Sequence, residues 1–200
     1  MRAKHTYRMK TFDDEAASAL SEWTEKEFRA TLGARPRQEI QEDNEYDPKG
    51  PHKWFAESVA DISAIIALRE MSETWRVRPP YPSWRSCAPG IRQRADEMVL
   101  AAKLPPGVTF VQWFAANEVL LQEEPERSER TRIVAVALLP LFEEKLDCWD
   151  AMNWLDDDMT HETFRECLRD WHSRVPEQHR PFVRRIAAEF GIEIDDRVGR

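Results

Sequence analysis

The stretch HKWFAESVADISAIIALREMSETW, residues 52–75, decides the fold. Its apolar residues recur with helical spacing and together fill most of the circumference of a helix. The apolar stripe and the apolar residues beside it are Phe55, Val59, Ile62 and Ile66, with Trp54, Ile65, Leu68 and Met71. A helix that is apolar almost all round is usually covered by neighbours. We therefore expect residues 52–75 to form the central helix of an all-α domain.

The segments on either side of this helix predict two connections. Residues 34–51 are polar and end in Asp47-Pro48-Lys49-Gly50-Pro51, which is typical of a loop. Residues 76–90 hold four prolines, at positions 79, 80, 82 and 89. Because proline lacks an N–H donor and disfavours helical backbone in the residue before it, we expect this Pro-, Arg- and aromatic-rich connection to be extended and not helical.

Other segments with helical spacing bring the expected total to about eight helices, packed as one compact domain over residues 1–200. These segments are 12–32, 91–104, 109–124, 128–139, 147–155, a helix capped by Thr160, and 181–190. Thr109 and Gln112 have the spacing of a capping box. Residues 133–139 are also compatible with a buried strand. We expect residues 192–200 to be a charged tail.

Composition limits the class of protein. The chain has 200 residues, a formal net charge of −8, and 8 Trp, 9 Phe and 3 Tyr, which are too many aromatics for a disordered chain. The longest uncharged stretch, residues 104–117, is too short for a membrane span, and the first residues lead into acids and not into an apolar run. Three cysteines without C-x-x-C spacing favour a reducing compartment. We therefore expect a cytoplasmic protein without a membrane partner.

An arginine-rich segment stands out in this acidic chain. The 22 residues between Glu73 and Asp96 contain five arginines and no Asp or Glu. The predicted partner-binding residues are Arg76, Arg78, Tyr81, Trp84, Arg85, Arg92 and Arg94. Arginines and aromatics on a stiff backbone suit docking on an acidic protein surface, clamping a phosphate or stacking on bases. In the alternative interpretation, Trp75 and Trp84 fill the core and the arginines pair with acidic helices nearby.

Four carboxylates have a suggestive spacing. Glu126 and Glu129 lie three apart, and after 14 intervening residues Glu144 and Asp147 again lie three apart. The order E-x-x-E then E-x-x-D resembles the Mg²⁺-binding pattern of the all-α nucleotide pyrophosphohydrolases, the MazG-like and dimeric dUTPase group. The resemblance implies a Mg²⁺-dependent enzyme with its carboxylates on two facing helices. A charged, solvated helical face is the alternative.

Other catalytic and metal-binding patterns do not occur. Zinc sites use tight Cys or His pairs, and the cysteines and histidines of the last third lack that spacing. These residues are Cys148, His161, Cys167, His172 and His179. The sequence also has no P-loop, no dinucleotide-binding glycine motif and no nucleophile elbow. It therefore predicts no cofactor, with Mg²⁺ as the alternative if the four carboxylates form a site.

These observations favour a non-enzymatic protein-interaction module, of the inhibitor, immunity, anti-defence or adaptor type. Its expected partner is another protein, and a nucleic-acid-binding protein is one candidate, since acidic helix faces suit a basic groove. The first alternative is the Mg²⁺-dependent nucleotide pyrophosphohydrolase. The second is direct contact with nucleic acid through residues 76–94, although a net charge of −8 disfavours general binding to phosphates.

Overall fold

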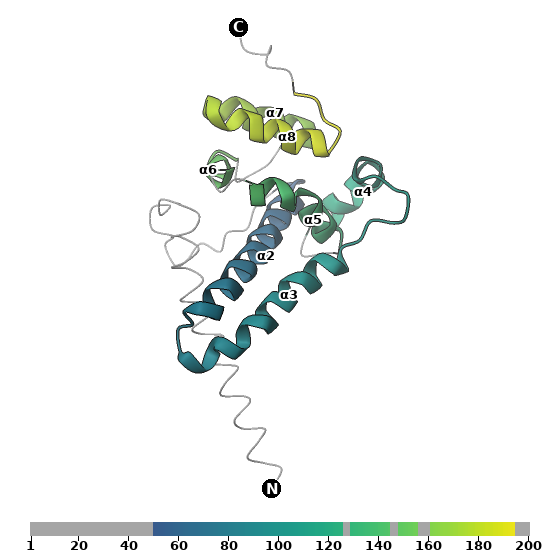
Figure 1. Cartoon of the computed structure of the whole chain (residues 1–200). Helices are drawn as coiled ribbons and strands as arrows, with labels where there is room; N and C mark the ends of the chain where they lie inside the picture. Colours follow the sequence, from purple (N-terminus) through teal and green to yellow (C-terminus); the bar gives the residue numbers. More distant parts are fainter. Residues whose placement is uncertain (1–49, 126–128, 145–147, 156–160, 195–200) are drawn as a thin grey trace. The chain divides into compact units, whose positions relative to one another are not determined.

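A computed structural model describes residues 50–125, 129–144, 148–155 and 161–194 (Figure 1). Within these residues there are seven α-helices, two short 3-10 helices and no β-strand, which confirms the all-α prediction. The elements are α2 (Lys53–Val77), η1 (Pro82–Cys87), α3 (Ala88–Ala101), α4 (Phe110–Glu123), α5 (Glu129–Glu144), α6 (Cys148–Met152), α7 (Phe164–Arg174), η2 (Glu177–His179) and α8 (Arg180–Glu189). All described residues fall within one compact unit. The expected helix over 12–32, most of the loop over 34–51 and residues 195–200 of the tail lie outside the described residues.

Helix α2 is central, as its apolar circumference predicts. It packs against α3, α4 and α5, and Figure 1 shows α3 running beside it. Its buried side chains extend from Trp54 and Phe55 near the first turn to Trp75 near the last. The helix ends at Val77, two residues later than expected. At 1.5 Å per residue, its 25 residues span about 36 Å.

The prediction that residues 76–90 are extended and not helical is wrong for most of the segment. Arg76 and Val77 complete α2, η1 begins at Pro82, and α3 begins at Ala88, so only residues 78–81 are non-helical. Pro82 and Pro89 both stand in the first turn of a helix. The N–H of a first-turn residue has no intrahelical acceptor, so proline loses nothing there and its fixed φ favours the helix. These prolines therefore start helices instead of excluding them.

Three other predictions can be compared with the structure. Residues 133–139 belong to α5, which continues through Pro140 to Glu144, so the buried-strand alternative is wrong. The capping box of α4 forms as predicted, because Thr109 Oγ1 accepts from the N–H of Gln112, and the Gln112 side chain accepts from the N–H of Thr109. The N-cap of α7 is Thr163 and not Thr160, since Thr163 and Glu166 form the reciprocal capping box.

Rings from four parts of the chain form one aromatic cluster in the core. Phe164 at the start of α7 lies 4.6 Å from Trp54, 5.2 Å from Phe55 and 4.9 Å from Phe190, between ring centroids. Phe114 of α4 lies 4.7 Å from Phe190. All five rings are buried. The cluster therefore joins the first turns of α2 and α7 to α4 and to the end of α8.

Candidate functional site

Most of the predicted contact residues lie at the C-terminal end of α2, in η1 and in the residues between these two elements. We call residues 76–85 the tip. The chain turns back at the tip so that α3 runs beside α2 (Figure 1). The N–H of Arg78 donates to the carbonyl of Thr74 and closes the last turn of α2. The tip is thus anchored at one end by α2, the longest of the described helices, and at the other by α3.

Two buried indoles hold the tip in place. Trp75 of α2 and Trp84 of η1 are 2% and 6% exposed, and their ring centroids lie 5.3 Å apart. Tyr81 packs edge-on against Trp84 at 4.8 Å and stays 57% exposed. Of the two aromatic residues predicted to contact a partner, only Tyr81 is therefore accessible. Trp84 supports the surface from below, as the alternative interpretation of the sequence expects.

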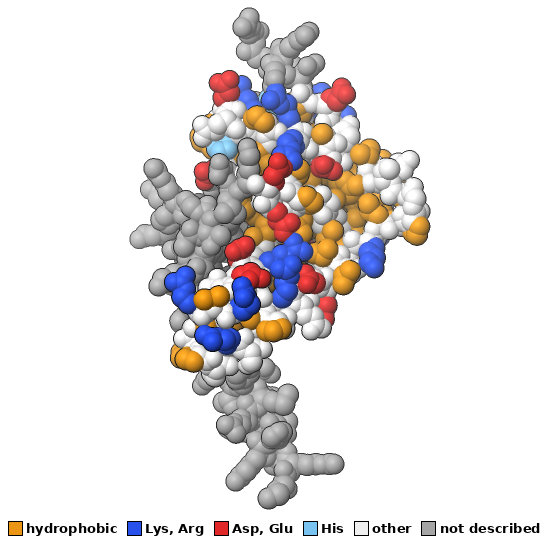
Figure 2. Space-filling view, in the orientation of Figure 1, with side chains coloured by type: hydrophobic (Ala, Val, Ile, Leu, Met, Phe, Trp, Pro, Cys, Tyr) orange, Lys and Arg blue, Asp and Glu red, His pale blue; other side chains and the backbone are white. Residues whose placement is uncertain are grey.

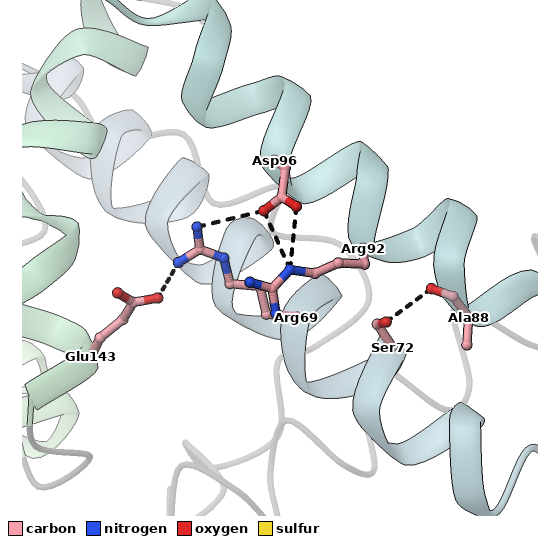
Figure 3. Close-up of polar contacts among 6 residues, drawn as sticks. All are labelled: Arg69, Ser72, Ala88, Arg92, Asp96 and Glu143. Carbon is pink, nitrogen blue, oxygen red and sulfur yellow. Dashed lines mark hydrogen bonds and ion pairs between the residues drawn. The ribbon is translucent and has the colours of Figure 1, made fainter.

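Two polar contacts reinforce this packing. The Ser72 hydroxyl of α2 donates to the carbonyl of Ala88, the first residue of α3, at 2.8 Å (Figure 3). The Arg85 guanidinium donates to the carbonyl of Val77 at 3.2 Å. That carbonyl belongs to the last turn of α2, which has no intrahelical donor for it, so Arg85 acts as a C-terminal cap. Three prolines, at positions 79, 80 and 82, restrict the remaining backbone.

The remaining arginines of the tip face solvent. Arg76 is 70% exposed and pairs with Glu73 one turn earlier, at 3.3 Å. Arg78 is exposed, and no ion pair joins it to a carboxylate among the described residues. Val77 is 57% exposed between them. Figure 2 shows Lys or Arg side chains beside apolar side chains at the end where α2 and α3 meet. The tip is therefore a cationic surface with apolar side chains among the charges.

Arg92 and Arg94 are not part of the tip. Both lie on α3 and pair within it, Arg92 with Asp96 at 3.3 Å and Arg94 with Glu97 at 3.8 Å. Asp96 also lies 3.9 Å from Arg69 of α2, which in turn pairs with Glu143 of α5 (Figure 3). These groups link α2, α3 and α5. The predicted set of seven contact residues therefore divides into a tip and an ion-paired face of α3.

The four carboxylates of the Mg²⁺ pattern are only half described, because Glu126 and Asp147 lie outside the described residues. Glu129 and Glu144 are the first and last residues of the single helix α5, which places them about 22 Å apart along its axis. They do not lie on two facing helices, and Glu144 pairs with Arg185. Within the described residues, no three His, Cys, Asp or Glu side chains gather in a way that could hold a metal ion.

A buried histidine at the start of α2 was not indicated by the sequence. His52 is fully buried, its Nε2–H donates to the carbonyl of His161 at 3.1 Å, and its ring lies 5.6 Å from Phe164. With Nε2 as the donor, Nδ1 is the unprotonated nitrogen, and it has no hydrogen-bond partner. Burial is the main effect on His52 and lowers its pKa below the usual value of 6.5. The hydrogen bond to the His161 carbonyl and the Glu166 carboxylate act in the opposite direction, and the nearby His161 side chain lowers the pKa further.

This lowered pKa predicts a loss of stability in mild acid. Well above pH 6.5 His52 is neutral in both states, so it adds no pH dependence there. Below pH 6.5 the unfolded chain takes up a proton that folded His52 resists, so the free energy of unfolding falls by up to about 1.4 kcal/mol per pH unit. Urea unfolding of wild type and His52→Gln at pH 7.5 and 5.5 measures this difference. Identical pH dependence of the two proteins would show that His52 does not cause it.

No family model matches this chain, and neither a curated protein nor a solved structure matches it. None of the helices within the described ranges has both the length and the apolar character that crossing a membrane requires.

Proposed function

We propose that this protein is a non-enzymatic interaction module that binds another protein in the cytoplasm, as an inhibitor, immunity or anti-defence protein, or adaptor. The observation that carries this proposal is the tip, where Arg76, Arg78 and Tyr81 are exposed on a backbone braced by buried Trp84. Arginine and tyrosine are among the residues that contribute most to binding energy at protein interfaces.

The chemistry of the tip defines the surface that it would bind. Exposed guanidinium groups attract an acidic surface, which speeds association and orients the partner. Val77 and Tyr81 are apolar surface between those charges. We therefore expect the partner to present carboxylates around a small apolar patch.

The bracing of the tip also favours binding. A flexible loop loses conformational entropy when it binds, and that loss weakens the complex. The Trp75–Trp84 contact and the Ser72 and Arg85 hydrogen bonds restrict the tip before a partner arrives. Such a preformed surface suits rapid and specific docking.

The test compares two double variants that remove the same charge. Arg76→Gln/Arg78→Gln changes the tip, and Arg92→Gln/Arg94→Gln changes arginines that pair within α3. Each protein is used to capture partners from a lysate of the native host, with quantification by mass spectrometry. We expect the tip variant to retain at least one partner tenfold less than wild type, a change of about 1.4 kcal/mol, and the α3 variant to retain it normally.

Two outcomes contradict the proposal. If the tip variant retains every partner as well as wild type and the α3 variant do, the tip is not the contact surface. Direct binding of a short single-stranded RNA or DNA, steeply salt-dependent and lost in the tip variant, shows instead that the tip contacts nucleic acid.

A further inference from the structure

A second cationic feature lies between α7 and α8, in the C-terminal part of the sequence. It is a cleft of about 690 Å³, and its lining includes Arg165, Arg169, Arg184, Ile192, Glu193 and Ile194. We call it the arginine cleft. Figure 2 shows Lys or Arg side chains over the α7–α8 pair. Small-molecule sites typically have volumes of about 300–1,000 Å³, so the cleft has a suitable size.

The cleft is built on rigid elements. Arg165 and Arg169 lie one turn apart on α7, whose opposite face buries Phe164, Cys167, Leu168 and Trp171. Arg184 comes from α8, which packs on α7. The chain then turns at Gly191, with φ of 70°, and the N–H of Ile192 donates to the carbonyl of Ala187 at 2.9 Å. This helix-ending motif brings residues 191–194 alongside the arginines.

Among the described residues, the two α7 arginines of the cleft have no carboxylate partner. No ion pair joins Arg165 or Arg169 to a carboxylate among the described residues. Glu166, between them in sequence, has its carboxylate engaged with the N–H of Thr163 in the capping box. Arg184 has a contact of its own, so the argument rests on the two α7 arginines. Two like charges one turn apart on a helix are unfavourable unless an anion lies between them.

We propose that the arginine cleft binds a small ligand that carries a phosphate monoester. Guanidinium groups match phosphate oxygens with paired hydrogen bonds. The two α7 guanidinium groups outnumber the Glu193 carboxylate in the lining, so these residues leave a net positive charge that attracts the anionic phosphate monoester. Ile192 and Ile194 line the same cleft, so the organic part of the ligand packs on apolar side chains. This site is independent of the tip.

Phenyl phosphate and inorganic phosphate are the probes, because they differ only in the apolar group. We expect phenyl phosphate to bind wild type with a Kd of about 1 mM or lower, and more tightly than inorganic phosphate. Isothermal titration measures the affinity, and amide chemical shifts measure which residues respond. We expect the responding amides to lie within residues 164–194.

The matched variants are Arg165→Gln/Arg169→Gln and Arg92→Gln/Arg94→Gln, which remove the same charge from exposed helix faces. We expect the first to weaken phenyl phosphate binding at least tenfold and the second to leave it unchanged, with both variants keeping the wild-type thermal midpoint. Absence of binding to wild type overturns the proposal, and so does equal weakening by both variants, which indicates attraction by net charge alone. Loss of partner capture in the tip variant does not affect this result.

Discussion

Phe164→Ala is expected to lower the free energy of unfolding by about 3–5 kcal/mol. Phe164 is fully buried, and its ring contacts rings from α2, from α4 and from the end of α8. Alanine leaves a cavity where these elements meet, and no single helix can move to fill it without losing its other contacts. Because domains are typically stable by about 5–15 kcal/mol, this one substitution removes a large part of the total.

Urea unfolding and the thermal midpoint measure this loss. For a chain of this length each kcal/mol corresponds to about 2–4 °C, so we expect the midpoint to fall by about 6–20 °C. Phe164→Leu, which keeps most of the apolar volume, should lose less. Val119→Ala, at an exposed position of α4, is the surface control and should change stability by less than about 0.5 kcal/mol. A loss in Phe164→Ala no larger than that of Val119→Ala would mean that the aromatic cluster does not hold these helices together.

Local sequence signals were sufficient for much of the fold. The apolar circumference of residues 52–75 identified the central helix, and Thr109 with Gln112 located the start of α4. Both features depend on residues within one or two turns of each other, so spacing alone reveals them. The position of Gly191 after α8 is likewise a local signal, since only its positive φ ends the helix in this way.

The prolines of residues 76–90 show where a local rule was incomplete. Their number indicated extended backbone, but the effect of a proline depends on whether it stands in the first turn or the interior of a helix. Pro82 and Pro89 are in first turns. The rule for helix caps was also applied incompletely at α7. Thr160 and Thr163 both have a side chain that can cap a helix, but only Thr163 has a Glu three residues later to complete the capping box.

Helical spacing accounts for only part of the candidate sites. The pairs of Arg92 with Asp96 and of Arg94 with Glu97 follow from helical spacing and were predictable. The burial of Trp84 requires Trp75 to face it across the turn between α2 and η1. The arginine cleft requires α7 to pack beside α8, which brings Arg184 near Arg165 and Arg169. No pattern in the sequence specified either arrangement.

Trp84→Ala is expected to lower the free energy of unfolding by about 3–5 kcal/mol, the range for removing a buried aromatic ring. Trp84 is 6% exposed and lies between Trp75 and Tyr81. Without it, the tip loses the ring that holds η1 against the end of α2. Urea unfolding measures the change, and hydrogen exchange at the amides of residues 76–90 measures whether the loss is concentrated at the tip. Unchanged stability would mean that Trp84 does not support the tip.

Arg78→Gln distinguishes direct contact with a partner from structural support of the tip. Arg78 is exposed and forms no ion pair with the described residues, so this substitution should change stability by less than about 0.5 kcal/mol. If the tip binds a partner, Arg78→Gln weakens binding in a protein that remains fully folded, whereas Trp84→Ala weakens binding because it disorders the surface. Loss of binding in Trp84→Ala is therefore informative only beside the result for Arg78→Gln. Normal binding by Arg78→Gln combined with loss in Trp84→Ala would place the contact on the neighbouring side chains, Val77 and Tyr81.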